Sequence, residues 1–213
     1  VETVHDRLER ELSAQLVDIQ AQLAAITNLI KDSTYISAIK SLTENHIAPI
    51  LSMWQQYCEI VQAKDTDQAT LGRLTDEILN SSTGIRPHVT AITLTLKGSS
   101  LTGDVPLAGM FAEFAKNQGR FGEFDDQPSY KDTIDPYTQY FVDLVVMGVT
   151  LMTEAWHQKG DVKAAQATLG DMWEDIRTIY QAGGYPVSDD KVVTQLSTAK
   201  AWTRDSLCVT ATF

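Results

Sequence analysis

The segment from Tyr137 to Lys159 constrains the fold of this chain more than any other part of it. Its apolar residues do not follow one stripe but are distributed around the whole circumference of a helix. A helix that is apolar on nearly all faces has to be covered by other elements on nearly all sides. We therefore expect it near the axis of a helical bundle. The residues concerned are Phe141, Val142, Leu144, Val145, Val146, Met147, Val149, Leu151, Met152 and Trp156.

The same segment does not predict a constitutive transmembrane helix. Its longest nearly apolar run, from Tyr140 to Met152, is interrupted by Asp143 and is shorter than the roughly 18 to 20 residues that a spanning helix needs. Two interpretations stay open from the residues alone. The helix is a permanent core helix, or it is stored in the bundle and released into a bilayer.

Amphipathic patterns precede this helix and predict the elements that cover it. The first is a long helix whose seam repeats every three or four residues, formed by Leu8, Leu12, Leu16, Ile19, Leu23, Ile26 and Ile30. A second helical region spans residues 34–62 and contains Pro49, which removes a backbone donor and clashes with the preceding turn. We expect a break or kink between Thr43 and Ala48, giving either two shorter helices or one bent helix.

The next two segments are shorter. Asp67 can cap a helix that carries Leu71, Leu74 and Ile78, and the polar stretch 80–84 ends that helix. Residues 88–97 are ambiguous, because their apolar residues fit a strand as well as a helix. Since the neighbouring segments are helical, we predict a helix there.

Capping signals mark the remaining helices. Asp104 with Pro106, and Asp135 with Pro136, each place an N-cap before a proline in the first turn. Between the two helices that they start, residues 119–133 form the longest predicted loop, a candidate for a mobile or cleavable segment. After Gly160 an amphipathic helix carries Leu169, Met172, Trp173, Ile176 and Ile179 and ends at Gly183 and Gly184. A last helix starts near residues 188–190.

Together these patterns predict a single all-α domain over residues 1–213, a bundle of about seven or eight helices around a central apolar helix.

The charge of the chain excludes one class of partner. It has 17 Lys and Arg against 28 Asp and Glu, a formal net charge of -11. Such a chain repels phosphate backbones, so we expect no nucleic-acid partner. Simple adsorption to anionic membranes at neutral pH is disfavoured for the same reason.

We find no motif for catalysis, a cofactor or a metal. The four histidines are His5, His46, His88 and His157, and no two are spaced as zinc ligands on a helix. The Glu-x-x-His spacing of carboxylate-bridged metal bundles occurs once, at Glu154 and His157, whereas that chemistry needs it twice. The two cysteines, Cys58 and Cys208, are interpreted as buried thiols, with a disulfide between them as the alternative. We therefore expect a protein that is not an enzyme.

Two stretches of the sequence resemble a known family. Pro136-Tyr137-Thr138-Gln139, the apolar helix and Glu154-Ala155-Trp156 together resemble the central helix of the N-terminal pore-forming domain of insecticidal crystal toxins, the delta-endotoxins. The segment 201–209 (AWTRDSLCV) is similar to a helix that follows it in that domain. The stretch between the two matches carries its own amphipathic helix and is longer than in the family. No β-rich receptor-binding domains follow, so the resemblance implies a fragment or a stand-alone relative.

The resemblance implies a secreted, toxin-like protein whose partners are a target-cell membrane or a membrane receptor, with homo-oligomer formation allowed. A helical hairpin would insert, pairing residues 105–116 with 137–157. The candidate membrane-inserting residues are Val142, Leu144, Val145, Val146, Met147, Val149, Leu151 and Met152. The alternative is a helical protein-interaction or scaffold module with no membrane activity.

Overall fold

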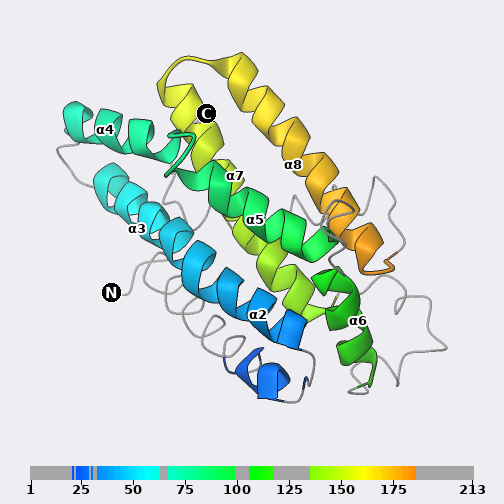
Figure 1. The fold of residues 1–213 in the computed structure, drawn as a ribbon. Helices are drawn as coiled ribbons and strands as arrows, with labels where there is room; N and C mark the ends of the chain where they lie inside the picture. Colours follow the sequence, from blue (N-terminus) through cyan, green and yellow to red (C-terminus); the bar gives the residue numbers. More distant parts are fainter. Residues whose placement is uncertain are drawn as a thin grey trace, which may run out of the picture.

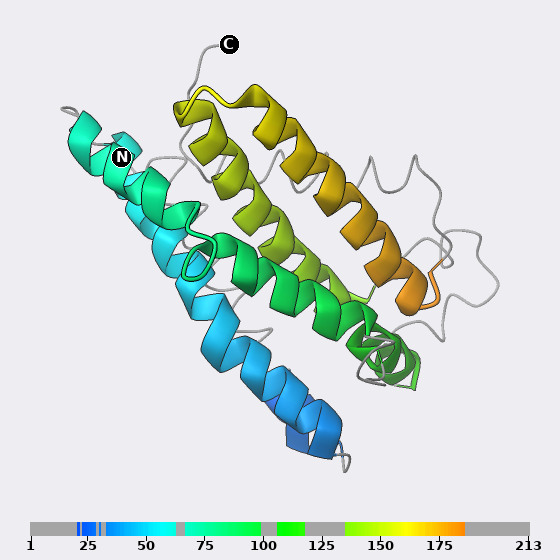
Figure 2. The ribbon, with the colours of Figure 1, turned by 45° about the horizontal axis from the view of Figure 1, so that its top comes forward.

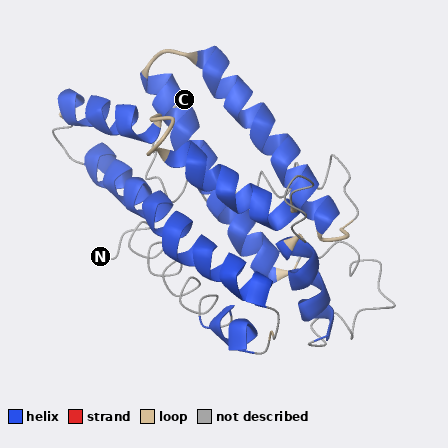
Figure 3. Ribbon diagram, viewed as in Figure 1, coloured by secondary structure: helices blue, strands red, loops and turns tan. Residues whose placement is uncertain are grey.

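The computed structural model describes residues 21, 23–28, 30, 33–62, 67–98, 106–117 and 135–185. This part of the chain is helical apart from turns and contains no strand (Figure 3). The all-α fold class is confirmed, and the ambiguous residues 88–97 are helical. Of the first predicted helix, residues 23–28 are seen as helix. Most of that helix, Asp104, the loop 119–133 and the last helix with Cys208 lie outside the described residues.

The helices surround α7 (Figures 1 and 2). Their bounds are Ser33–Leu42 (α2), Thr43–Ile47 (η1, a π-helical turn), Ala48–Gln62 (α3), Gln68–Ile78 (α4), Ile85–Lys97 (α5), Leu107–Asn117 (α6), Pro136–Gln158 (α7) and Val162–Ala182 (α8). The α7 helix packs against α3, α4, α5, α6 and α8. Its predicted place at the centre of the bundle is therefore confirmed for the described residues.

The region 34–62 forms one continuous helical run with a π turn in its middle, at the predicted place. The π turn occupies residues 43–47, directly before Pro49. In an α-helix the ring of Pro49 would clash with the carbonyl of Asn45 and leave that carbonyl without a donor. A π turn moves this carbonyl out of α-helical register, so the helical run continues past Pro49. The expected alternative of two shorter, separate helices is therefore wrong.

A tight turn joins α4 to α5. The side chain of Asn80 accepts hydrogen bonds from the backbone N–H groups of Ser82 and Thr83, at 2.9 and 3.0 Å. At Gly84 a Cβ atom would lie 2.4 Å from the carbonyl oxygen of Ile78, so only glycine fits. The predicted Asp67 cap is present as well, accepting from the N–H of Ala69 at 3.0 Å. Local polar residues thus fix both ends of α4.

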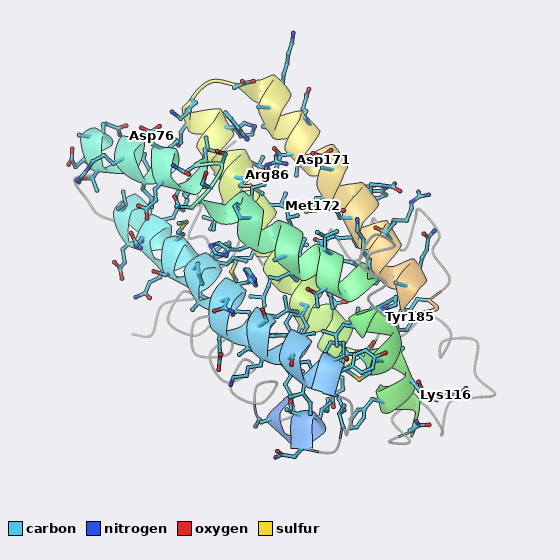
Figure 4. The ribbon with its side chains drawn as sticks, viewed as in Figure 1. Asp76, Arg86, Lys116, Asp171, Met172 and Tyr185 are labelled. Atoms are coloured by element: carbon cyan, nitrogen blue, oxygen red, sulfur yellow. The ribbon has the colours of Figure 1, made fainter. Side chains whose placement is uncertain are left out.

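The α8 helix lies antiparallel to α7 and covers one of its sides (Figure 2). Leu169 was expected on its inner side, but this prediction is wrong, because the side chain is 42% exposed. The buried face of α8 contains Thr168 in place of Leu169, together with Ala165. Both side chains are small, which allows close helix packing. Figure 4 shows Arg86 on α5 and Asp171 on α8, an exposed ion pair at 3.8 Å on the outer surface of this layer.

Candidate functional site

The α7 helix carries every residue that the sequence singled out for membrane insertion. All eight side chains are buried, with exposed fractions from 0% at Val145 and Leu151 to 4% at Met147 and Met152. They contribute to one hydrophobic core together with residues of the covering helices. In this structure the α7 helix is therefore covered by the other helices, and its apolar surface can contact a membrane only if these helices separate.

The start of α7 is fixed by the predicted cap. The carboxylate of Asp135 accepts hydrogen bonds from the N–H groups of Tyr137 and Thr138, at 3.0 and 2.8 Å. Pro136 follows in the first turn, where no N–H is needed. Asp135 itself is completely buried. Burial raises its pKa, and these hydrogen bonds oppose that rise.

Tyr185 completes the surroundings of Asp135, a role that the sequence did not indicate. Its hydroxyl donates to the carboxylate Oδ2 of Asp135 at 2.5 Å and accepts from the backbone N–H of Asp135 at 3.0 Å. A C-terminal motif on α8 places Tyr185. Gly184 has a φ of 77°, and the N–H of Tyr185 donates to the carbonyl of Tyr180 at 3.0 Å. Glycine is needed at 184 for this turn, and it brings Tyr185 to the start of α7.

A second polar group lies one turn further along α7. The side-chain amide nitrogen of Gln139 donates to the carboxylate of Asp143 at 2.7 Å, and the hydroxyl of Tyr180 donates to the side-chain amide oxygen of Gln139 at 3.4 Å. Desolvation by burial raises the pKa of Asp143 to about 6, although the hydrogen bond from Gln139 acts in the opposite direction. Burial, then the charges of Asp143 and Asp135, also raise the pKa of Tyr180. Asp143 is thus a carboxyl group that becomes neutral at mildly acidic pH.

Aromatic contacts join α6 to the first turns of α7. Phe111 stacks on Phe141, with ring centroids 5.8 Å apart, and contacts Tyr137 at 5.6 Å. Phe114 meets Tyr137 edge to face at 6.1 Å. The two segments that the resemblance pairs as a hairpin therefore lie against each other, and α6 also packs on α5 and α8.

A pair of histidines from distant parts of the sequence meets between η1 and α5. The Nδ1 atoms of His46 and His88 are 3.1 Å apart, and both side chains are partly buried. No sequence pattern indicated this pair, because its members are 42 positions apart and lie on different helices. Burial lowers the pKa of both, and the charge of His46 lowers that of His88 further.

The single Glu-x-x-His motif, at Glu154 and His157, lies in the last turns of α7. Glu154 is partly buried, and His157 is exposed in the last turn of α7. In the described ranges, no group of three or more His, Cys, Asp or Glu side chains is placed to hold a metal ion. Cys58 is buried. The described part of the chain therefore presents a buried apolar helix with one buried and one partly buried acid, and a histidine pair between η1 and α5.

Comparison with known proteins adds no relative. No protein family, no curated protein and no solved structure matches this chain. Among the described helices, none combines the length and the apolar character needed to cross a membrane.

Proposed function

We propose that this protein is a non-enzymatic, membrane-active helical bundle, in which α7 is the segment that enters a target bilayer after the covering helices separate. The observation that carries the proposal is the composition of α7. From Pro136 to Thr153 its only Asp, Glu, Lys, Arg or His residue is Asp143. Burial raises the pKa of this residue to about 6. At mildly acidic pH this stretch is uncharged while it is still inside the bundle.

The ends of α7 support the same proposal. Tyr137 and Tyr140 lie in its first turns and Trp156 in its last. Tyrosine and tryptophan favour the two interfaces of a bilayer. Between Tyr137 and Trp156 the rise of a helix is about 28 Å, close to the thickness of a hydrocarbon core at about 30 Å.

The lack of a spanning helix among the described residues limits how α7 can insert. A charged Asp143 near the bilayer centre would cost about 2.5–3.5 kcal/mol on insertion scales, whereas the neutral acid costs less. Protonation of Asp143 does not itself open the bundle, since a raised pKa means that the folded state gains stability as the proton binds. Opening therefore needs a second event, such as contact with the target membrane or cleavage of the chain.

Dye release from liposomes tests the proposal. Neutral and anionic vesicles are treated with the protein from pH 7.5 to pH 4.5, with and without limited proteolysis. The wild type should release dye as the pH falls through about 6, and Asp143→Asn should release it already at neutral pH. Glu77→Gln removes an exposed acid on α4 and should follow the wild type. A folded wild type that releases no dye under any of these conditions would refute the proposal.

A helical interaction module is the second candidate. It is favoured by the completeness with which α7 is covered and by the three large apolar residues that are exposed in the described part, Leu94, Val162 and Leu169. Leu94 and Leu169 belong to α5 and α8, which pack against each other. Multi-angle light scattering of the wild type and of Leu94→Ser with Leu169→Ser tests this candidate. An oligomer that the double substitution dissociates, without dye release by either protein, would support it.

A further inference from the structure

The histidine pair joins η1 to α5 and has no part in the proposed function. His46 belongs to the π turn η1 and His88 to the first turns of α5, and these two elements pack against each other. The ring centroids are 5.4 Å apart, and the two Nδ1 atoms are 3.1 Å apart. One Nδ1–H therefore donates to the other Nδ1, which requires different tautomers in the two rings. π turns are frequent at functional sites.

We propose that His46 and His88 form a binding site for a late first-row divalent cation such as Zn²⁺, held by the two Nδ1 atoms. Imidazole nitrogens suit Zn, Cu and Ni ions. The Zn–N distance in proteins is about 2.0–2.1 Å. Two such nitrogens that are 3.1 Å apart make an N–Zn–N angle of about 100°, close to the tetrahedral angle. The pair thus already has the spacing of two ligands on one ion.

Binding needs a rearrangement that the site allows. The two nitrogens now face each other, so each ring has to turn until both lone pairs converge on the ion. The ring that donates Nδ1–H loses that proton from Nδ1 and rebinds one at Nε2, so that both rings coordinate as neutral imidazoles and no net proton is released. Both side chains are partly exposed, so water can occupy the remaining positions of the ion.

The surroundings of the pair favour neutral imidazoles, the form that a metal requires. Burial keeps the pKa of both histidines below the ordinary value. On the helical run that carries His46, the exposed side chains of Lys40 and Glu44 pair with each other at 3.9 Å. With only two protein ligands, the site should bind more weakly than a closed site with four, and it would link η1 to α5.

Titration of the full chain with Zn²⁺ alone tests the site. The variant His5→Gln with His157→Gln leaves His46 and His88 as its only histidines and should still bind one ion per chain by calorimetry. Binding should raise the melting temperature of this variant and of the wild type by several degrees. In nitrogen-15 NMR spectra, Zn²⁺ should shift the Nδ1 resonances of both remaining histidines.

The substitutions His46→Gln and His88→Gln should each abolish the saturable binding and the rise in melting temperature. Circular dichroism checks that these variants stay helical. If either fails to fold, the NMR shifts in the variant that keeps only the pair decide the question. Binding that survives in a folded His46→Gln protein, or Nδ1 resonances that Zn²⁺ leaves unchanged, would show that the pair is only a hydrogen bond between helices and overturn the proposal.

Discussion

Tyr185 and Asp135 hold together the end of α8 and the start of α7, through a hydroxyl-to-carboxylate hydrogen bond of 2.5 Å and a backbone hydrogen bond of 3.0 Å to the same hydroxyl. Asp135 is completely buried, so a lost partner is not replaced easily by water. Hydrogen bonds to charged groups contribute about 1.5–3 kcal/mol. The pair therefore closes the α7–α8 unit at the end opposite to its connecting turn.

We expect Tyr185→Phe to lower the free energy of unfolding by about 1.5–3 kcal/mol, since it leaves a buried carboxylate with one partner fewer. Tyr180→Phe is the matched control, because its hydroxyl makes only a long hydrogen bond of 3.4 Å to Gln139. Urea denaturation followed by circular dichroism measures both. Equal losses in the two variants would contradict the role given to Tyr185.

Asp143→Asn should stabilise the protein at neutral pH, by about 1–3 kcal/mol, because it removes a charge that burial disfavours. The sign follows from the raised pKa of about 6 in the folded state, against 3.8 as the ordinary value. The stabilising contribution of Asp143 is complete below pH 3.8 and is lost as the pH rises through 6. The advantage of the variant should therefore grow between pH 4 and pH 6 and then stay constant.

Thermal or urea unfolding across this pH range measures the effect of Asp143→Asn. Glu77→Gln, on the exposed side of α4, serves as the control and should run parallel to the wild type. If Asp143→Asn also runs parallel to the wild type from pH 4 to pH 7, the carboxyl of Asp143 titrates normally and the proposed acid dependence of membrane action loses its basis.

Gly148→Ala should destabilise the protein by about 1–3 kcal/mol, the range for an overpacked core. The added Cβ would lie 2.5 Å from Cγ2 of Val89 and 3.0 Å from Cγ2 of Ile85, so α5 would have to move away from α7. This cost exceeds the gain of up to about 1 kcal/mol that alanine brings to a helix.

Gly170→Ala provides the control, because nothing lies within 4 Å of the added Cβ on α8. There the helix propensity acts alone, and the variant should be more stable than the wild type by up to about 1 kcal/mol. Adding Val89→Ala to Gly148→Ala should recover part of the loss. Unfolding free energies of the four proteins give the comparison, and a stabilised Gly148→Ala protein would show that the approach of α5 to α7 is not tight.

Local sequence signals predicted much of the described fold. The caps at Asp67 and Asp135 depend on neighbouring N–H groups, and the end of α8 depends on Gly183 and Gly184, so short stretches contain the necessary information. The burial of α7 follows from its own composition. Leu169 was misplaced because the buried stripe of α8 is formed partly by Ala165 and Thr168, whose small size conceals it in a hydrophobic pattern.

The polar contacts between helices were not predictable in this way. Tyr185 meets Asp135 across 50 residues, and His46 meets His88 across 42. Whether such side chains meet depends on how the helices are rotated against one another, which no single helix encodes. The raised pKa of Asp143 has the same origin, since it reflects desolvation by the helices packed around α7, and the hydrogen bond from Gln139 on the same helix acts against it. The predicted membrane-inserting residues stay a prediction.

The π turn between α2 and α3 makes the number of residues in this helical run important. A π turn contains one residue more than the α-helical turn that it replaces. Deleting one residue of the exposed pair Glu44 and Asn45 would therefore force this turn into α-helical register, in which the ring of Pro49 clashes with the carbonyl four residues before it. The deletion would also rotate the helix on one side of it by about 100° relative to the other side, so the His46 side chain would point in a different direction. The extra residue of the π turn thus serves both the continuity of the helix at Pro49 and the meeting of His46 with His88.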